Sequence, residues 1–278
     1  MGSLSIRGRA VWRSPFRRES ISVNRFISLL LALLAWALLS AARVTAPSTL
    51  ADKDQPKNAF YLLDILDHGH WAIQYSEGDD IATKPPLYSW MAAGLSLAAG
   101  RANDWTLLAP ALLSGLACLL VVWALGRDLG ARAAQAGYWR RPGDDEAASG
   151  ALYPGRTGAA VGLLAALVWA FTYHAQRLQW TARADMPLCA CILAALWASW
   201  RLQHSTFGAR QSFRWVFWAA ITLGLLAKGP VVLWVVILAL AVECVFRRTL
   251  RPLLDPAPWF GLPLALAVFG LWLWFAYR

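Results

Sequence analysis

Long apolar runs alternate with short polar segments along most of the chain. These runs cover residues 26–42, 85–100, 105–125, 158–180, 186–203, 213–227, 230–246 and 259–277. A helix needs about 20 apolar residues to cross the hydrocarbon core of a bilayer. The pattern therefore predicts an all-α integral membrane protein.

The run at 85–100 differs from the others. Its sequence, PPLYSWMAAGLSLAAG, has 16 residues of mostly small side chains, fewer than the roughly 20 that a span needs. Two consecutive prolines are tolerated at a helix start, where they stiffen the entry to the helix. We therefore expect an interfacial or re-entrant helix here, preceded by Lys84 at the membrane surface.

The basic residues test this interpretation. If the run 85–100 is not counted as a span, most of the 26 lysines and arginines fall on one side of the membrane. They lie in the N-terminal tail and in loops 126–157, 201–214 and 247–251. The positive-inside rule assigns that side to the cytosol. The result is about seven spans, with the N-terminus inside and the C-terminus outside.

The same pattern sets the domain organisation. Residues 1–25 form a basic cytosolic tail and residues 26–278 a transmembrane domain, with an outer loop at 43–104 that contains interfacial helices and a cytosolic loop at 126–157. The run 26–42 also suits a cleaved signal peptide. Pro47 would then follow the cut and the chain downstream stays apolar, which favours an uncleaved anchor.

Composition excludes several classes of protein. With 58% hydrophobic residues, 17 tryptophans and 15% charged residues, the chain departs from soluble domains, which are roughly 45–50% apolar. The net charge of +10 is explained by arginines between apolar runs, so we expect no nucleic-acid partner.

The four cysteines have no spacing typical of zinc sites or disulfide frameworks. His68 and His70 flank Gly69 and are candidate metal ligands, although solvated loop histidines are the commoner case.

Five ionisable residues far apart in sequence fall on the predicted outer face: Asp54, Lys84, Arg183, Asp185 and Lys228. Lys228 interrupts LGLLAKGPVVLWVV, and a charge there costs about 2.5–3.5 kcal/mol on insertion scales. A tight Lys-Gly-Pro turn is the alternative explanation for Lys228, and a place at the cap or in the first turn of a helix is the alternative for Asp185.

Cations and carboxylates at the rim of an apolar bundle suit a lipid-anchored phosphate. Lysine and arginine form charge-assisted hydrogen bonds to phosphate, and a neighbouring carboxylate can take a proton from an incoming hydroxyl. Together they indicate sugar transfer from a polyprenyl phosphate to an acceptor.

Five segments carry a resemblance to a known family. They are DQPKNAFYLLDILDHGHW (54–71), KPPLYSW (84–90), GRDLG (126–130), TARADMPL (181–188) and GLLAKGPVV (224–232). In this order they resemble the C-type, polyprenyl-phosphate-dependent membrane glycosyltransferases of the aminoarabinose transferase and protein O-mannosyltransferase type. The resemblance runs from about residue 25 to the end and corresponds to the N-terminal half of such enzymes.

The resemblance implies a GT-C-like bundle and an inverting transfer of a sugar to a hydroxyl or phosphate at the non-cytosolic face. Asp54 would be the catalytic base and Asp185 its catalytic partner. The expected substrate-binding residues are Lys57, Lys84, Arg183 and Lys228.

Three positions depart from that family. Gln55 stands where a glutamate is usual, Asn58 replaces a common tyrosine, and Thr83 replaces a glutamate implicated in metal binding. We therefore assign no metal ligand and no certain cofactor, and leave a divalent metal open. The expected partners are a polyprenyl-phosphate-linked sugar, a lipid or protein acceptor, and a second chain supplying further spans.

Two other functions fit the same residues. A catalytically inactive or partner-dependent accessory subunit would keep the site without the reaction, and a lipid-linked substrate carrier would use the charges for translocation. Carriers commonly show repeated halves, and we find no internal repeat. The expected location is a bacterial inner membrane, with the endoplasmic reticulum as the alternative.

Overall fold

The computed structural model describes residues 24–44, 55–76, 80–138, 153–256 and 261–276. The helices of these ranges are α1 (Arg25–Val44), α2 (Gln55–His68), α3 (Leu87–Ala99), α4 (Asp104–Gln135), α6 (Tyr153–Phe171), α7 (Tyr173–Gln179), α8 (Asp185–His204), α9 (Phe207–Lys228), α10 (Val231–Arg247), α11 (Arg251–Leu254) and α12 (Gly261–Ala276). Within the described residues, one isolated bridge between Tyr75 and Ile81 is the only β-pairing. The predicted all-α fold is confirmed.

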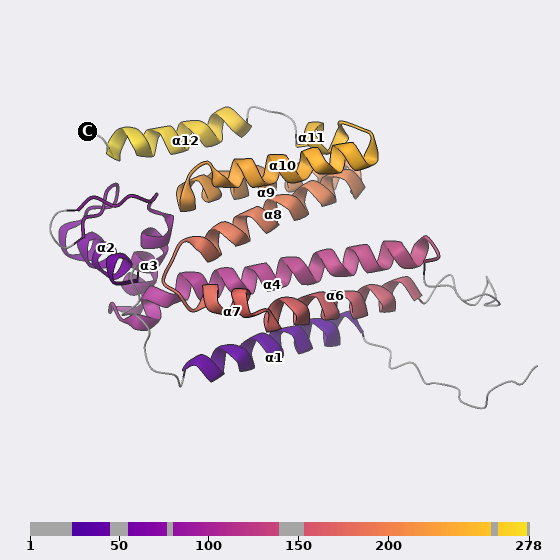
Figure 1. The fold of residues 1–278 in the computed structure, drawn as a ribbon, viewed down its shortest axis with the longest axis horizontal. Coiled ribbons are helices and arrows are strands. Elements are labelled where there is room, and N and C mark those ends of the chain that lie inside the picture. The colour runs from indigo at the N-terminus through magenta and orange to yellow at the C-terminus, as the bar shows by residue number, and fades with distance from the viewer. Residues whose placement is uncertain (1–23, 45–54, 77–79, 139–152, 257–260, 277–278) are drawn as a thin grey trace, which may run out of the picture.

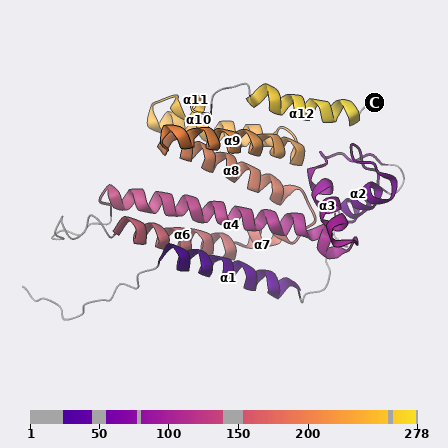
Figure 2. The same ribbon diagram turned by 180° about the vertical axis from the view of Figure 1, so that it is seen from behind.

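The long helices form an elongated bundle. Helices α1, α4, α6, α8, α9, α10 and α12 run lengthwise, while α2 and α3 gather at one end (Figure 1). The view from behind shows the same arrangement (Figure 2). Helix α4 packs on α6 and α8, α8 packs on α9, and α1 covers α6. Residues distant in sequence therefore meet at the two ends of the bundle.

Each run predicted as a span overlaps one of the lengthwise helices. By length and apolar character alone, α1, α4 and α8 qualify as membrane spans, and the bent pair of α6 and α7 adds a fourth. Helices α10 and α12 have 17 and 16 residues. Many of their apolar side chains, such as Trp234 and Leu238, are exposed in the isolated chain, as expected for surface that lipid covers.

The prediction of one continuous run at 158–180 is wrong. Helix α6 ends at Phe171, and α7 leaves it at an angle of 66°. Thr172 between them has extended backbone angles, and its hydroxyl donates to the Val168 carbonyl 2.6 Å away. Helix α7 also carries polar residues such as Gln176 and Gln179, so the chain changes both direction and polarity at Thr172.

Helix α3 has 13 residues and begins just after Pro86. It ends at Gly100, whose positive φ of 67° suits glycine. Tyr88, Ala92 and Ala93 are buried in the cluster that joins α2, α3 and α4. Burial raises the pKa of Tyr88, and its neutral phenol donates to the Leu107 carbonyl at 2.7 Å. This short helix is thus a packed element at one end of the bundle.

Glycines allow α4 and α6 to approach backbone to backbone. Each helix carries a Gly-xxx-Gly pattern, at Gly126 and Gly130 in α4 and at Gly158 and Gly162 in α6. A Cβ added to Gly162 would lie 2.9 Å from the Trp123 carbonyl oxygen. Small residues at such spacing permit close helix packing in membranes.

Gly162→Leu should therefore force α6 away from α4. We expect a loss of about 1–3 kcal/mol, typical of overpacking, seen as a lower Tm in detergent. The matched control is Gly155→Leu in the same helix, because a Cβ there meets no atom within 4 Å. Equal Tm values for the two variants would contradict this account of the contact.

Candidate functional site

Asp185 lies between two cations at the end of the bundle where α2 and α3 gather. Its Oδ1 contacts Nζ of Lys228, and its Oδ2 lies 3.2 Å from Nε of Arg183. The side chains are partly exposed, by 21% for Asp185 and 34% for Lys228. Ion pairs in such partly dry surroundings are stronger than fully solvated ones. The cluster therefore joins the start of α8 to the end of α9.

The local structure explains how these charges meet. Lys228 is the last residue of α9, and Gly229 follows with a φ of 71°, reversing the chain into α10 after Pro230. The turn proposed for Lys-Gly-Pro is thus present, together with the ion pair. Ala184 occupies the cap position of α8 and no side chain caps that helix. Asp185 thus occupies the first turn of α8, one of the two positions expected for it, and its carboxylate is directed to the two cations.

A cavity of about 300 Å³ adjoins this cluster. Lys84 and Lys228, from segments far apart in sequence, both line it. Its apolar wall includes Phe269, Trp272 and Leu273 of α12. The cavity thus combines two lysines with aromatic and aliphatic surface, a combination that suits an anion attached to a hydrophobic group.

Loop residues 72–74 and 81–85 complete the cavity wall. Trp272 Nε1 donates to the Ala72 carbonyl at 2.8 Å, and Trp90 Nε1 donates to the Trp71 carbonyl at 2.6 Å. The amide of Gln74, which is buried, donates to the carbonyls of His70 and Trp71. These bonds tie the loop to α3 and α12 and hold the segment that leads to Lys84.

Two amides fix the start of α2 beside Arg183. Gln55 Oε1 accepts from the Ala182 N–H at 3.0 Å, and Asn58 Nδ2 donates to the Ala182 carbonyl at 2.6 Å. Both side chains are buried. Gln55 and Asn58 departed from the family pattern in the sequence, yet here they bind the backbone N–H and the carbonyl of the same residue. Sequence reasoning missed this role, because no local signal links residue 55 to residue 182.

The predicted site residues are only partly brought together. Arg183, Asp185 and Lys228 form the ion-pair cluster, and Lys84 lines the cavity that Lys228 also lines. Lys57 is exposed on α2 and is not among the described lining residues. Asp54 lies outside the described residues and directly precedes Gln55 in the sequence.

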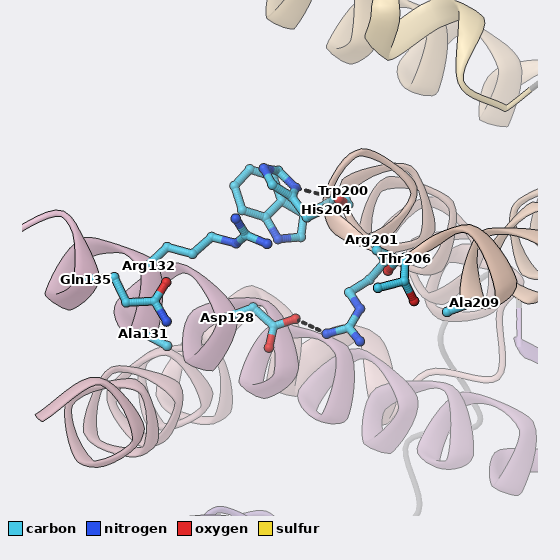
Figure 3. A pocket seen from close by; sticks show the side chains of 10 residues that line it. Asp128, Ala131, Arg132, Gln135, Trp200, Arg201, His204, Thr206 and Ala209 are labelled. Carbon is cyan, nitrogen blue, oxygen red and sulfur yellow. Dashed lines mark hydrogen bonds and ion pairs between the residues drawn. The ribbon is translucent and has the colours of Figure 1, made fainter. Parts of the chain in front are cut away.

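The opposite end of the bundle carries a second, arginine-rich pocket of about 380 Å³ (Figure 3). Asp128 of α4 lies 2.7 Å from the Arg201 guanidinium of α8, and the Arg132 guanidinium lies 5.7 Å from the centroid of the Trp200 ring. Among the described residues, Arg132 and Arg201, which the loop analysis assigned to the same side of the membrane, both line this pocket. The two pockets therefore differ chemically: among the described lining residues, the cations of the first are lysines and those of the second are arginines.

The fold is similar to that of ArnT, so the predicted resemblance is confirmed at the level of the fold. The chain superposes on ArnT from Cupriavidus metallidurans bound to undecaprenyl phosphate with a TM-score of 0.66 and 19% identity. For the apo state of ArnT from the same organism, the TM-score is 0.65 and the identity 20%. No family model and no curated protein matches the sequence.

The superpositions cover most of this chain but less than half of ArnT. Each superposition covers 90% of this chain and 41% of ArnT. The chain thus spans about two fifths of the length of those structures.

A double-substitution test measures the link between α8 and α9. Asp185→Asn removes the carboxylate shared by Lys228 and Arg183, and Lys228→Gln leaves Asp185 with Arg183 alone, so each should lower Tm in detergent. The double variant should lose less than the two losses combined, with a coupling energy of roughly 0.5–3 kcal/mol. Asp185→Asn combined with Glu243→Gln, at the other end of the bundle, is the control pair and should be additive. Additivity of the Asp185 and Lys228 changes would show that their contact contributes nothing.

Proposed function

We propose that this chain acts in sugar transfer from a polyprenyl-phosphate donor to an acceptor hydroxyl or phosphate. The observation that carries the proposal is the pair Lys84 and Lys228 on one cavity that has an aromatic wall. The likeness of the fold to ArnT, solved with undecaprenyl phosphate, supports the same class of donor.

The cations would hold the donor phosphate. Lys84 and Lys228 reach the cavity from two sides, and Arg183 adds a third positive charge next to Asp185. The apolar wall of α12 would receive the first part of the lipid. As the bond between the sugar and the phosphate breaks, negative charge grows on the phosphate oxygen, and fixed cations lower the barrier by stabilising that charge.

Asp54 is the proposed base, as the family resemblance implies. The acceptor oxygen would attack the anomeric carbon, its proton would pass to Asp54, and polyprenyl phosphate would leave with the bonding electron pair. One such displacement inverts the anomeric centre. Asp185 has both carboxylate oxygens engaged by cations, so within this proposal it positions Lys228 and Arg183 and does not take up the proton.

A metal in this cavity is not part of the proposed reaction. The family resemblance places a metal-binding glutamate at the position of Thr83. Among the described residues, the cavity lining offers no carboxylate, imidazole or thiol. These residues do not fit a divalent metal, so the cations of the chain itself would carry the electrostatic role.

In the proposed orientation the protein lies in a bacterial inner membrane, with the lysine cavity at the outer face and the arginine-rich pocket at the cytosolic face. Thr83→Cys and Gln135→Cys, both at exposed positions, report on the two ends. In intact cells a membrane-impermeant maleimide should label the first variant and spare the second. The wild-type chain, whose four cysteines are buried or half-buried, gives the background. Labelling of Gln135→Cys with sparing of Thr83→Cys would reverse the orientation.

Separate measurements of donor binding and of sugar transfer distinguish the role proposed for the two lysines from that proposed for Asp54. With the chain in detergent or membranes and labelled undecaprenyl-phosphate sugar, Lys84→Met and Lys228→Met should each weaken donor binding roughly 10- to 100-fold, because a hydrogen bond to a charged group contributes about 1.5–3 kcal/mol. Asp54→Asn should keep donor binding and lower transfer by about 10²–10⁴-fold, the usual contribution of a general base.

The controls distinguish site effects from general loss. Arg101→Gln and Asp67→Asn change exposed charges at the same end of the bundle and should alter neither measurement. Binding without transfer in the wild-type chain would favour the accessory role over the enzyme. Unchanged donor binding in both lysine variants would rule out the proposed phosphate site.

A further inference from the structure

Three potential metal ligands meet at the end of α2, and none of them is among the described residues that line the lysine cavity. Oδ1 of Asp64 lies 3.2 Å from Nδ1 of His68 and 3.0 Å from Nδ1 of His70. One donor atom from each of the three residues falls within 4.8 Å of the others. The two imidazole rings lie nearly parallel, with centroids 5.7 Å apart.

The backbone brings these side chains together. Asp64 and His68 are four residues apart on α2, so they share one face of the helix. Gly69 then takes a φ of 72°, and its N–H closes the helix on the Ile65 carbonyl at 3.1 Å. This left-handed turn, which favours glycine, directs His70 back to the carboxylate that His68 already contacts.

Asp64 is held in place by its second oxygen. Oδ2 accepts the Tyr75 N–H at 2.9 Å, and the side chain is 10% exposed. Carboxylates that ligate metals are commonly fixed by a hydrogen bond of this kind. The imidazoles are 66% and 47% exposed, so water can complete a coordination shell.

The distances suit a small tetrahedral ion. With bonds of about 2.0–2.1 Å, neighbouring ligand atoms of Zn²⁺ lie ~3.3 Å apart, close to the two nitrogen–oxygen distances here. Two imidazoles and one carboxylate favour Zn²⁺ and its first-row neighbours, whereas Mg²⁺ and Ca²⁺ prefer oxygen ligands.

We propose that Asp64, His68 and His70 bind one Zn²⁺ ion at the end of α2. The ion would join α2 to the loop that begins at Trp71. That loop supplies Ala72 and Gln74 to the cavity wall, so the metal stabilises the wall and takes no part in the proposed transfer. The site stands on its own geometry and does not depend on the proposed function.

The test is Zn²⁺ binding by the full chain, prepared in detergent without a polyhistidine tag. Isothermal titration should show one Zn²⁺ per chain, and Mg²⁺ in excess should not displace it. His68→Asn and His70→Asn should each weaken binding at least roughly 10- to 100-fold, since even indirect partners of metal ligands contribute that much. Zn²⁺ should also raise the Tm of the wild-type chain and leave that of the double histidine variant unchanged.

His174→Asn is the matched control, because His174 is exposed on α7 outside the cluster; its Zn²⁺ affinity should equal that of the wild type. Tm values measured with a chelator should agree for all variants, which checks that the exposed substitutions leave the fold intact. The proposal fails if the wild-type chain shows no saturable Zn²⁺ binding, or if either single histidine variant binds as well as the wild type.

Discussion

A charge at the end of an apolar helix requires a counter-charge, and the pairing of Lys228 with Asp185 meets this requirement. Lys228 follows the apolar stretch of α9, and Asp185 opens α8, the helix that packs along α9. Leaving either charge without a partner in partly dry surroundings would be costly. The contact thus fixes the start of α8 relative to the end of α9, and Arg183 forms a second ion pair with the same carboxylate.

The rest of that end is assembled around this pair by polar bonds between distant segments. Gln55 and Asn58 bind the backbone N–H and the carbonyl of Ala182, which places α2 next to Arg183. Trp272 and Trp90 hold the loop that carries residues 71 and 72. In an apolar bundle these bonds are directional, so they define positions that hydrophobic packing alone leaves loose. A cavity with lysines from two segments results from them.

The two ends of the bundle have distinct chemistry. One carries the lysine cavity and the three ligand atoms at the end of α2, whereas the other carries Asp128 bonded to Arg127 and Arg201. Between them, glycines let α4 and α6 touch along their backbones. The proposed enzyme function uses only the first end, and the arginines of the second suit the cytosolic interface proposed for it.

The sequence by itself determined the class of fold, because apolar runs of spanning length and arginine-rich loops have few physical solutions other than a helical membrane bundle. It also grouped Arg183, Asp185 and Lys228 with Asp54 and Lys84 on one face, since a topology places loop ends on the same side, and the first three do meet in the structure. It could not show the break at Thr172, the amide bonds of Gln55 and Asn58, or the return of His70 to Asp64. These features depend on contacts between residues far apart in the chain or on a single backbone angle, and only the tertiary structure decided them.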